Sequence, residues 1–237
     1  MSDTNYEVEL KVLLWTAFPP EIFIKALAKD FKSVREATEE THRNHYFEVP
    51  HRVKIMPAFE ERLPIDHEDK LRIQEFRNWN DIVVRSREIK TVAWTQVLLV
   101  MKSTVDWGRS QNGTIRKELE IPIPMSIEDL DAILTAQAEI RPQAKWSRIR
   151  KTFDVVDKDG FYFTVCLDKN AGYWYIVEFE VVVTNPSVIE STKFKLQNCI
   201  KTMWLTELPA DQLHRMFEFY TKNWESFYQT ENYFFIK

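Results

Sequence analysis

Residues 6–12 read YEVELKV, a stretch in which apolar and charged side chains alternate one by one. Side chains on a β-strand point to opposite faces in turn, so Glu7, Glu9 and Lys11 share one face of the predicted strand and the residues between them share the other. The charged face meets either water or a ligand. This stretch alone does not decide between the two, and the answer depends on whether other strands repeat the pattern.

From residue 81 onward the sequence predicts one strand after another. Turn-forming residues separate the strands, and such short connections favour antiparallel pairing. The predicted strands cover residues 81–89, 95–104, 113–123, 146–156, 161–169 and 173–183. One or two short strands are also expected within residues 42–65, where Pro50, Pro57 and Pro64 interrupt a segment rich in strand-forming residues.

Four segments have apolar residues at helical spacing, namely 21–34, 126–140, 187–204 and 209–228. Their apolar faces need a surface to pack against, and the apolar sides of the strands are the available surface. Helices in that position would turn the charged faces of the strands inward. The sequence therefore predicts an α+β fold, mainly β, with a closed or nearly closed sheet around a polar lumen.

The period-two pattern places acids and bases together on the proposed inner faces. The acids are Glu7, Glu9, Glu118, Glu120, Asp168, Glu178 and Glu180, and the bases are Lys11, Arg85, Arg87, Lys102, Arg116, Arg148 and Arg150. For any single strand, a salt-bridged row facing solvent is the ordinary explanation. The same pattern on six strands favours a lumen instead. A lumen with both signs suits an anionic polyphosphate held by bases together with a divalent cation held by carboxylates.

Composition excludes several other classes. The 237 residues fit a single domain spanning 1–237, and the four glycines form no Gly-rich phosphate loop. Cys166 and Cys199 have no Cys or His neighbours at zinc spacing, which predicts no zinc, a reducing compartment and an inert buried thiol at Cys166. No secretory signal and no apolar run long enough for a membrane span is visible. A soluble, intracellular protein with no membrane partner is therefore expected.

In their order along the chain, these motifs resemble the CYTH superfamily, also called triphosphate tunnel metalloenzymes. Glu7, Glu9 and Lys11 match its N-terminal Glu-x-Glu-x-Lys strand, and residues 46–50, YFEVP, resemble its Tyr-Phe-Asp-Thr-Pro-like strand with Glu for Asp and Val for Thr. The later motifs are the Arg-x-Arg of Arg85 and Arg87, a strand ending in Lys102, the Arg-x-Glu-x-Glu of Arg116, Glu118 and Glu120, the basic pair Arg148 and Arg150, the acid Asp168, and the closing Glu-x-Glu of Glu178 and Glu180. The resemblance spans residues 6–183.

The resemblance implies a closed, eight-stranded antiparallel tunnel with helices packed on its outside. It also implies hydrolysis or cyclisation of triphosphates with Mg²⁺ or Mn²⁺, with all fourteen residues of the two ionic rows in the catalytic site. The metal would be held by Glu7, Glu9, Glu178 and Glu180, joined by Glu118 or Glu120. The phosphates would be held by Lys11, Arg85, Arg87, Lys102, Arg116, Arg148 and Arg150.

The substrate is less sharply indicated than the reaction. The leading expectation is a metal-dependent RNA 5′-triphosphatase of the mRNA-capping type, located in the nucleus with a capping guanylyltransferase as partner. It rests on the expanded segment 16–80, the added C-terminal helices, and the aromatic residues Trp107, Trp146, Tyr173 and Trp174 near predicted strand ends. Such rings can stack on a base, although packing is the ordinary role of each. The alternatives are an inorganic tripolyphosphatase or thiamine triphosphatase in the cytoplasm, an adenylyl cyclase, and a non-catalytic polyphosphate-binding module.

Overall fold

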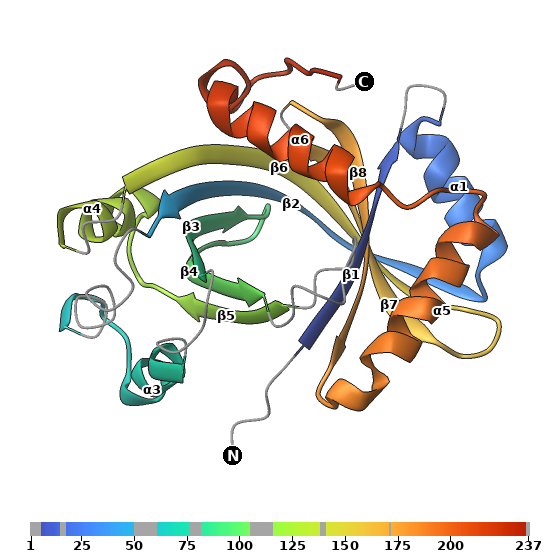
Figure 1. The fold of residues 1–237 in the computed structure, drawn as a ribbon, viewed down its shortest axis with the longest axis horizontal. Coiled ribbons are helices and arrows are strands. Elements are labelled where there is room, and N and C mark those ends of the chain that lie inside the picture. The colour runs from blue at the N-terminus through green and yellow to red at the C-terminus, as the bar shows by residue number, and fades with distance from the viewer. Residues whose placement is uncertain are drawn as a thin grey trace.

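A computed structural model of the chain describes residues 6–14, 18–49, 61–75, 82–104, 116–137, 141–170 and 172–235. Eight strands and five helices make up its main elements in these ranges (Figure 1). The strands are β1 (Tyr6–Leu14), β2 (Ser33–Glu48), β3 (Ile82–Lys90), β4 (Thr95–Thr104), β5 (Arg116–Pro122), β6 (Arg141–Val156), β7 (Tyr162–Asn170) and β8 (Trp174–Val183). The helices are α1 (Pro20–Asp30), α3 (His67–Glu75), α4 (Ile127–Gln137), α5 (Ile189–Thr202) and α6 (Ala210–Asn223).

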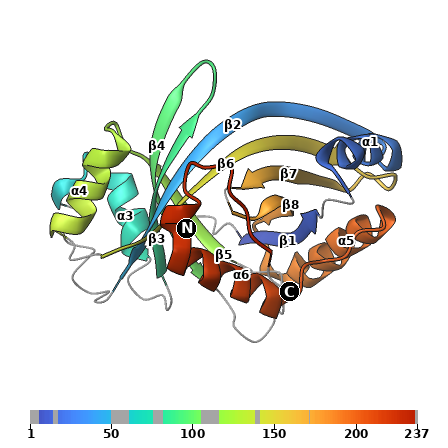
Figure 2. The same cartoon turned by 90° about the horizontal axis from the view of Figure 1, so that it is seen from above.

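The strands form one antiparallel sheet in the order β1-β5-β4-β3-β2-β6-β7-β8, with β8 returning to β1. Figure 2 shows β2, β6, β7, β8 and β1 side by side in a strongly curved array. The strand order is circular, but the seam between β1 and β5 consists of only two residue pairs, at Tyr6 and Glu7. From Val8 to Leu14 no described residue of β5 pairs with β1. The predicted eight antiparallel strands are therefore present, and the expected continuous closure is reduced to a narrow seam.

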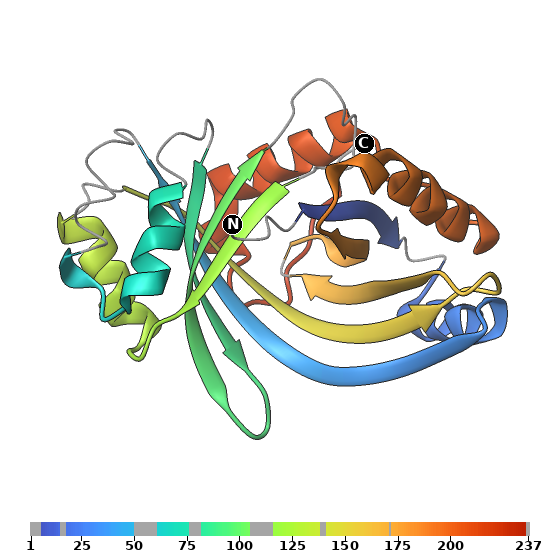
Figure 3. The same cartoon turned by 90° about the horizontal axis from the view of Figure 1, so that it is seen from below.

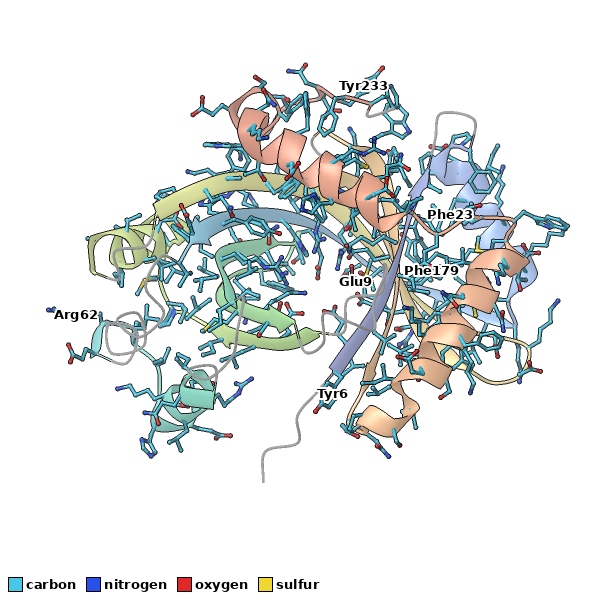
Figure 4. All side chains as sticks on the ribbon, viewed as in Figure 1. Tyr6, Glu9, Phe23, Arg62, Phe179 and Tyr233 are labelled. Atoms are coloured by element: carbon cyan, nitrogen blue, oxygen red, sulfur yellow. The ribbon has the colours of Figure 1, made fainter. Side chains whose placement is uncertain are left out.

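The first of three hydrophobic clusters that the described residues form lies outside the sheet, between β1, β6, β7, β8 and the helices α1 and α5. The apolar side of β1 is fully buried there, with Val8, Leu10, Val12 and Leu14 at most 2% exposed. Phe23 of α1 and Leu196 of α5 pack in the same cluster. Figure 4 shows Phe179 of β8 on the side that faces α5 and Glu9 of β1 on the side that faces the other strands. The period-two pattern therefore separates an apolar outer surface from a charged inner one.

A second core lies under α3 and α4, against the outer sides of β3, β4 and β5. It contains Val84, Leu99 and Ile121 from the strands and Leu130 and Leu134 from α4. Seen from below, these two helices lie on the opposite side of the molecule from α1 and α5 (Figure 3). Helices thus cover the apolar sides of the strands on both flanks, as the sequence predicts.

The structure corrects several expected boundaries. The predicted helix over 21–34 ends at Asp30, and Ser33 already begins β2, a strand of 16 residues. The short strands expected within 42–65 are the end of this one long strand, and residues 50–60 lie outside the described ranges. The helix α3 was not predicted. The helix predicted over 126–140 covers Ile127–Gln137, and β6 begins at Arg141 instead of residue 146.

Within the described ranges, the structure contains no helix of the length and apolar character needed to cross a membrane.

Candidate functional site

The charged faces of the strands converge on one cavity of about 500 Å³ inside the sheet, here called the lumen. Every residue of the two predicted ionic rows lines it, with the exception of Arg116. The side chain of Arg116 lies outside the described part of the chain, although its backbone pairs with Glu7 and Thr104. Residues separated by more than 160 positions in the sequence thus meet in one enclosed space.

Asp168 organises one group of bases. It is 1% exposed and accepts hydrogen bonds from Arg150 Nε and Nη2, each at 2.7 Å, and from Arg148 Nη1 at 2.8 Å. Such paired charge-assisted bonds fix the plane of a guanidinium group. Burial would lower the pKa of Arg150, but Asp168 and Glu178 outweigh it and raise that pKa well above its usual value. Both arginines are therefore held as rigid, charged donors.

A second basic group lies on β3 and β4. Arg85 contacts Glu118 at 3.2 Å, Lys102 contacts Glu118 at 2.6 Å, and Arg87 is paired with Glu120. Burial would raise the pKa of Glu118, but Lys102, Arg85 and Arg87 outweigh it and hold that pKa well below the usual range. Burial together with the neighbouring Arg85 lowers the pKa of Arg87 to about 10, which leaves it charged at pH 7. An anion in the lumen would relieve this crowding of positive charge.

Acidic side chains face one another where β1 meets β8. The antiparallel register sets Glu9 directly opposite Glu180, and like charges in that position destabilise a sheet. Glu9 is paired with Lys11, whereas no described residue forms an ion pair with Glu180. Burial, reinforced by Glu178 and Glu7, raises the pKa of Glu180 to about 7. Among the described residues, this wall therefore holds one carboxyl group, Glu180, that no base neutralises and that keeps a proton up to about neutral pH.

Glu7 and Glu178 differ in their surroundings, although both were predicted to bind a metal. Glu7 lies on the acidic wall and contacts Lys102 at 3.1 Å. Glu178 lies among bases: it contacts Lys11 at 2.5 Å and Arg148 at 3.7 Å, and it is paired with Arg150. Burial would raise its pKa, but Lys11 and Arg150 outweigh it and lower that pKa well below the usual value. Glu178 thus orients bases in this arrangement.

The donor chemistry of the acidic wall fits a hard cation. Carboxylate oxygens are the ligands that Mg²⁺ and Mn²⁺ prefer, and Glu7, Glu9 and Glu180 offer them on neighbouring strands. These side chains are turned toward protein partners in the structure. Among the described residues, no three acidic, His or Cys side chains are already gathered in the arrangement of a metal centre.

Two polar residues of β2, Asn44 and Tyr46, line the lumen, and a third, His42, contacts one of its bases; none of them was predicted as a site residue. Asn44 accepts a hydrogen bond from Arg87 Nε at 3.0 Å, and the Tyr46 hydroxyl accepts one from Arg85 at 3.0 Å. His42 Nδ1 accepts one from Arg148 Nε at 3.2 Å. Burial, with Arg148 and Arg150, lowers the pKa of His42 far below its usual value, so the ring is neutral. Strand periodicity alone could not single out these neutral side chains, because they look like polar residues on an exposed face.

Cys166 lies next to the acidic wall but is not reactive. Its side chain is buried, and its Sγ lies 3.7 Å from Glu180 Oε1. Burial raises the pKa of this thiol well above its usual value, so the nucleophilic thiolate does not form. The expectation of an inert thiol agrees with this environment.

The aromatic residues predicted near strand ends fall into different places. Trp146 lies inside β6, stacks on Tyr220 with ring centres 4.1 Å apart, and packs with Tyr173 in the cluster around α6. Both line the lumen, but their neighbours show that packing accounts for them. Trp174 lines a different cavity, described below. Trp107 lies outside the described residues.

Solved structures share this fold at low sequence identity. The PH1819 protein of Pyrococcus horikoshii OT3 aligns with a TM-score of 0.58 and 18% identity over 85% of this chain and 92% of that protein. A candidate adenylate cyclase of Vibrio parahaemolyticus aligns with a TM-score of 0.55 and 14% identity over 85% and 90%. A chain of the Schizosaccharomyces pombe Mediator head module reaches a TM-score of 0.50 at 10% identity over 83% and 94%. No protein-family model and no curated protein matches the sequence, so these likenesses concern the fold alone.

Proposed function

We propose that the protein is a triphosphate tunnel metalloenzyme of the CYTH type, which removes the terminal phosphate of a triphosphate with Mg²⁺ or Mn²⁺. The observation that carries this proposal is the lumen, where six bases and seven acids line one cavity of about 500 Å³. A sheet that served only as a scaffold would have no need to bury so many ions, because burial of each is costly. A triphosphate anion bound together with a divalent cation would pair with both the bases and the acids of the lumen.

The bases would hold the phosphate oxygens. Arg148 and Arg150 form one fork, oriented by Asp168, and Arg85, Arg87 and Lys102 face it from β3 and β4. Their charges are fixed before the substrate arrives, so little reorganisation is needed as negative charge grows on the transferred group. Lys11 also lines the lumen, next to Glu9 and Glu178, and would contact the same phosphates.

The acidic wall would hold the cation. We assign Glu7, Glu9 and Glu180 to it, with Glu178 joining when the substrate takes over its bases. A bound divalent ion polarises the phosphoryl group and lowers the pKa of the attacking water. The carboxylates themselves would fix the position of the cation against the phosphate-binding arginines, and in the free protein they pair with the neighbouring lysines.

For the substrate, we propose the 5′-triphosphate end of RNA, as in mRNA capping, with nuclear location and a capping guanylyltransferase as partner. Inorganic tripolyphosphate and thiamine triphosphate are the alternatives for a cytoplasmic enzyme. Cyclisation of ATP is a further alternative, because a protein of this fold is described as a candidate adenylate cyclase. All of these substrates present the same three phosphates to the lumen, so the portion beyond the phosphates decides among them.

A non-catalytic polyphosphate-binding module is the second candidate function. One observation favours it: the described residues contain no preassembled metal centre. The same fold also occurs in a chain of the Mediator head module. Such a module would bind polyphosphate tightly and release no phosphate in the presence of Mn²⁺.

The deciding experiment measures phosphate release from γ-labelled triphosphorylated RNA, tripolyphosphate, thiamine triphosphate and ATP at matched Mg²⁺ and Mn²⁺ concentrations. The proposal predicts metal-dependent release with RNA preferred. Preference for tripolyphosphate would contradict the RNA assignment, and formation of cyclic AMP would favour the cyclase.

Two carboxylate variants separate hydrolysis from binding. Glu9→Gln is expected to lower turnover about a hundredfold or more. The substitution keeps the shape of the side chain but removes the carboxylate that is proposed to bind the metal. Glu36→Gln is the matched control, since Glu36 is more than half exposed and lies outside the lumen. If Glu9→Gln retains full turnover, the acidic wall does not hold the catalytic cation.

A further inference from the structure

A second cavity, of about 680 Å³, adjoins the lumen. Ser147, Arg148 and Asn170 line both cavities, so the two share one boundary on β6 and β7. The second cavity is bordered by β2 and β3 on one side and by residues 229–235, here called the C-terminal strap, on the other. A substrate with phosphates in the lumen and further atoms beyond Arg148 would enter this second cavity.

The C-terminal strap is fastened to the sheet by specific bonds. Gly172 donates a backbone hydrogen bond to Asn232 at 3.0 Å and accepts one from Phe234 at 2.8 Å. The backbone N–H of Gln229 donates to Ser147 Oγ at 3.0 Å, and Lys169 contacts Glu231 at 2.5 Å. The strap is therefore a fixed wall of the cavity, and it sets Tyr233 next to β8.

Two aromatic rings meet on this wall. Trp174 and Tyr233 have ring centres 5.3 Å apart and planes inclined by 64°. Tyr233 is 51% exposed, and Figure 4 shows it at the rim of the molecule beside α6. Trp174 has φ = 75°, a left-handed conformation that a non-glycine residue adopts only where the surrounding structure imposes it. The backbone is thus held in a strained form that places this indole at the cavity.

The charge of the cavity narrows the kind of ligand. Its lining contains four bases and two acids, together with hydroxyl and amide side chains; the bases are Arg43, Lys90, Arg148 and Lys169, and the acids are Glu88 and Glu231. A lining with an excess of positive charge disfavours the cationic thiazolium of thiamine. It favours an aromatic ring linked to phosphates.

We infer that the second cavity binds the nucleoside next to the triphosphate, with its base stacked on Trp174, in edge contact with Tyr233, and with its polar edges facing the amides of Gln229 and Asn232. This inference rests on the proposed function, because it takes the triphosphate to lie in the lumen. Triphosphorylated RNA and ATP both present a nucleoside 5′-triphosphate to this site. The excess of bases favours RNA over a free nucleotide, since RNA adds a phosphodiester after the first nucleoside.

The test compares Trp174→Ala with the wild type on triphosphorylated RNA, ATP and tripolyphosphate, with Trp174→Phe as the conservative variant. Stacking on an aromatic side chain predicts about a tenfold rise in KM for RNA upon Trp174→Ala, recovered largely by Trp174→Phe. Tripolyphosphate has no atoms beyond the lumen, so its KM is expected to change less than twofold. A lower KM for RNA than for ATP in the wild type identifies RNA as the source of the nucleoside.

Trp204→Ala is a matched control, because Trp204 also has a positive φ, is 95% exposed and lines neither cavity. Equal KM changes for RNA and tripolyphosphate upon Trp174→Ala would mean that Trp174 only supports the fold, and no change for RNA would mean that no base stacks there. Either result overturns the inference and leaves the proposed hydrolysis standing. If the wild type releases no phosphate from any substrate, the proposed function fails. Equilibrium binding of triphosphorylated RNA against tripolyphosphate to the same variants then decides the nucleoside site.

Discussion

At the scale of single residues, Asp168 is expected to be the most sensitive position of the lumen. It is buried and holds two arginines at once, so Asp168→Asn leaves both cations without their main counter-charge. Removing one member of a buried ionic cluster costs about 3 to 5 kcal/mol. We expect a loss of this size in the free energy of unfolding, measured with urea.

Asp154→Asn provides the comparison for Asp168. Asp154 is also paired with an arginine on a neighbouring strand, but its partner Arg35 is 79% exposed. Exposed pairs contribute at most about 1 kcal/mol. Equal losses for the two variants would show that the lumen is open to water instead of enclosed.

Glu180 gives a pH dependence with a defined sign. Burial raises its pKa from the usual 4.5 to about 7, so between these values the folded chain binds a proton that the unfolded chain does not. Stability of the metal-free protein is therefore expected to fall as the pH rises from about 4.5 to about 7. Glu180→Gln should remove about 2 to 3 kcal/mol of this fall, measured by urea unfolding in a chelating buffer. If the stability of the variant depends on pH as that of the wild type does, Glu180 is not the cause of the fall.

The ionic rows could be predicted from the sequence because a strand has a strict period of two. Glu7 and Glu9 share a face of β1 whatever its position in the fold. The same period assigns the other charged residues to the inner faces of their strands. His42 and Asn44 could not be found in this way, because a neutral polar residue on an inner face looks like any exposed one. The partners of Asp168 also required the structure, since the register that sets Arg150 of β6 opposite Asp168 of β7 had to be known.

At the scale of elements, the contact between the β7–β8 turn and the C-terminal strap is expected to depend on Gly172. Its φ is +90°, and an added Cβ would lie 2.9 Å from the ring of Tyr220. Gly172→Ala therefore combines a left-handed backbone, which costs about 1 to 2 kcal/mol, with overpacking, which costs about 1 to 3 kcal/mol. We expect a lower thermal midpoint and faster hydrogen exchange in residues 229–235.

Gly160→Ala is the matched control for that element. Gly160 has nearly the same φ, +85°, but no atom lies within 4 Å of the position of an added Cβ. Gly160→Ala should lower the free energy of unfolding only by the backbone cost of about 1 to 2 kcal/mol. Hydrogen exchange in the C-terminal strap should not change. Identical hydrogen exchange in the two variants would argue that the strap does not depend on this contact.

The elements that the sequence did not reveal share a physical property. The first half of β2 is mostly exposed and is held by backbone pairing with β6, with a bulge between Glu36 and Glu39, so it carries no apolar alternation. The helix α3 is almost entirely polar and buries Ile73 beneath it. Periodicity detects an element through the face that it buries, and these two bury very little.

At the scale of the whole molecule, metal and triphosphate binding should be coupled. In the free protein the bases of the lumen are paired with its acids, so each ligand alone must break ion pairs. A cation on the acidic wall would release Lys11 and Lys102, and a triphosphate would release Glu9 and Glu7. We expect Mn²⁺ to tighten tripolyphosphate binding about tenfold or more, measured by calorimetry on the wild type with a non-hydrolysable, methylene-bridged analogue of tripolyphosphate to prevent turnover.

Because coupling between two ligands is reciprocal, tripolyphosphate must tighten Mn²⁺ binding by the same factor. Glu36→Gln, which alters the net charge by the same amount outside the lumen, controls for an effect of net charge. Independent binding of the two ligands would mean that the acids and bases of the lumen do not exchange partners.

The pairing of β1 with β8 has a consequence for how the chain is made. Lys11 and Glu178 are separated by 167 positions, so β1 leaves the ribosome roughly 10 to 30 s before its partner is synthesised. During that interval the apolar side chains of β1, from Val8 to Leu14, are covered by neither β8 nor α5. The nascent chain must therefore be shielded from aggregation by chaperones or by slow, temporary contacts. The yield of soluble protein upon expression should therefore rise with added chaperones, even if the folded protein itself is stable.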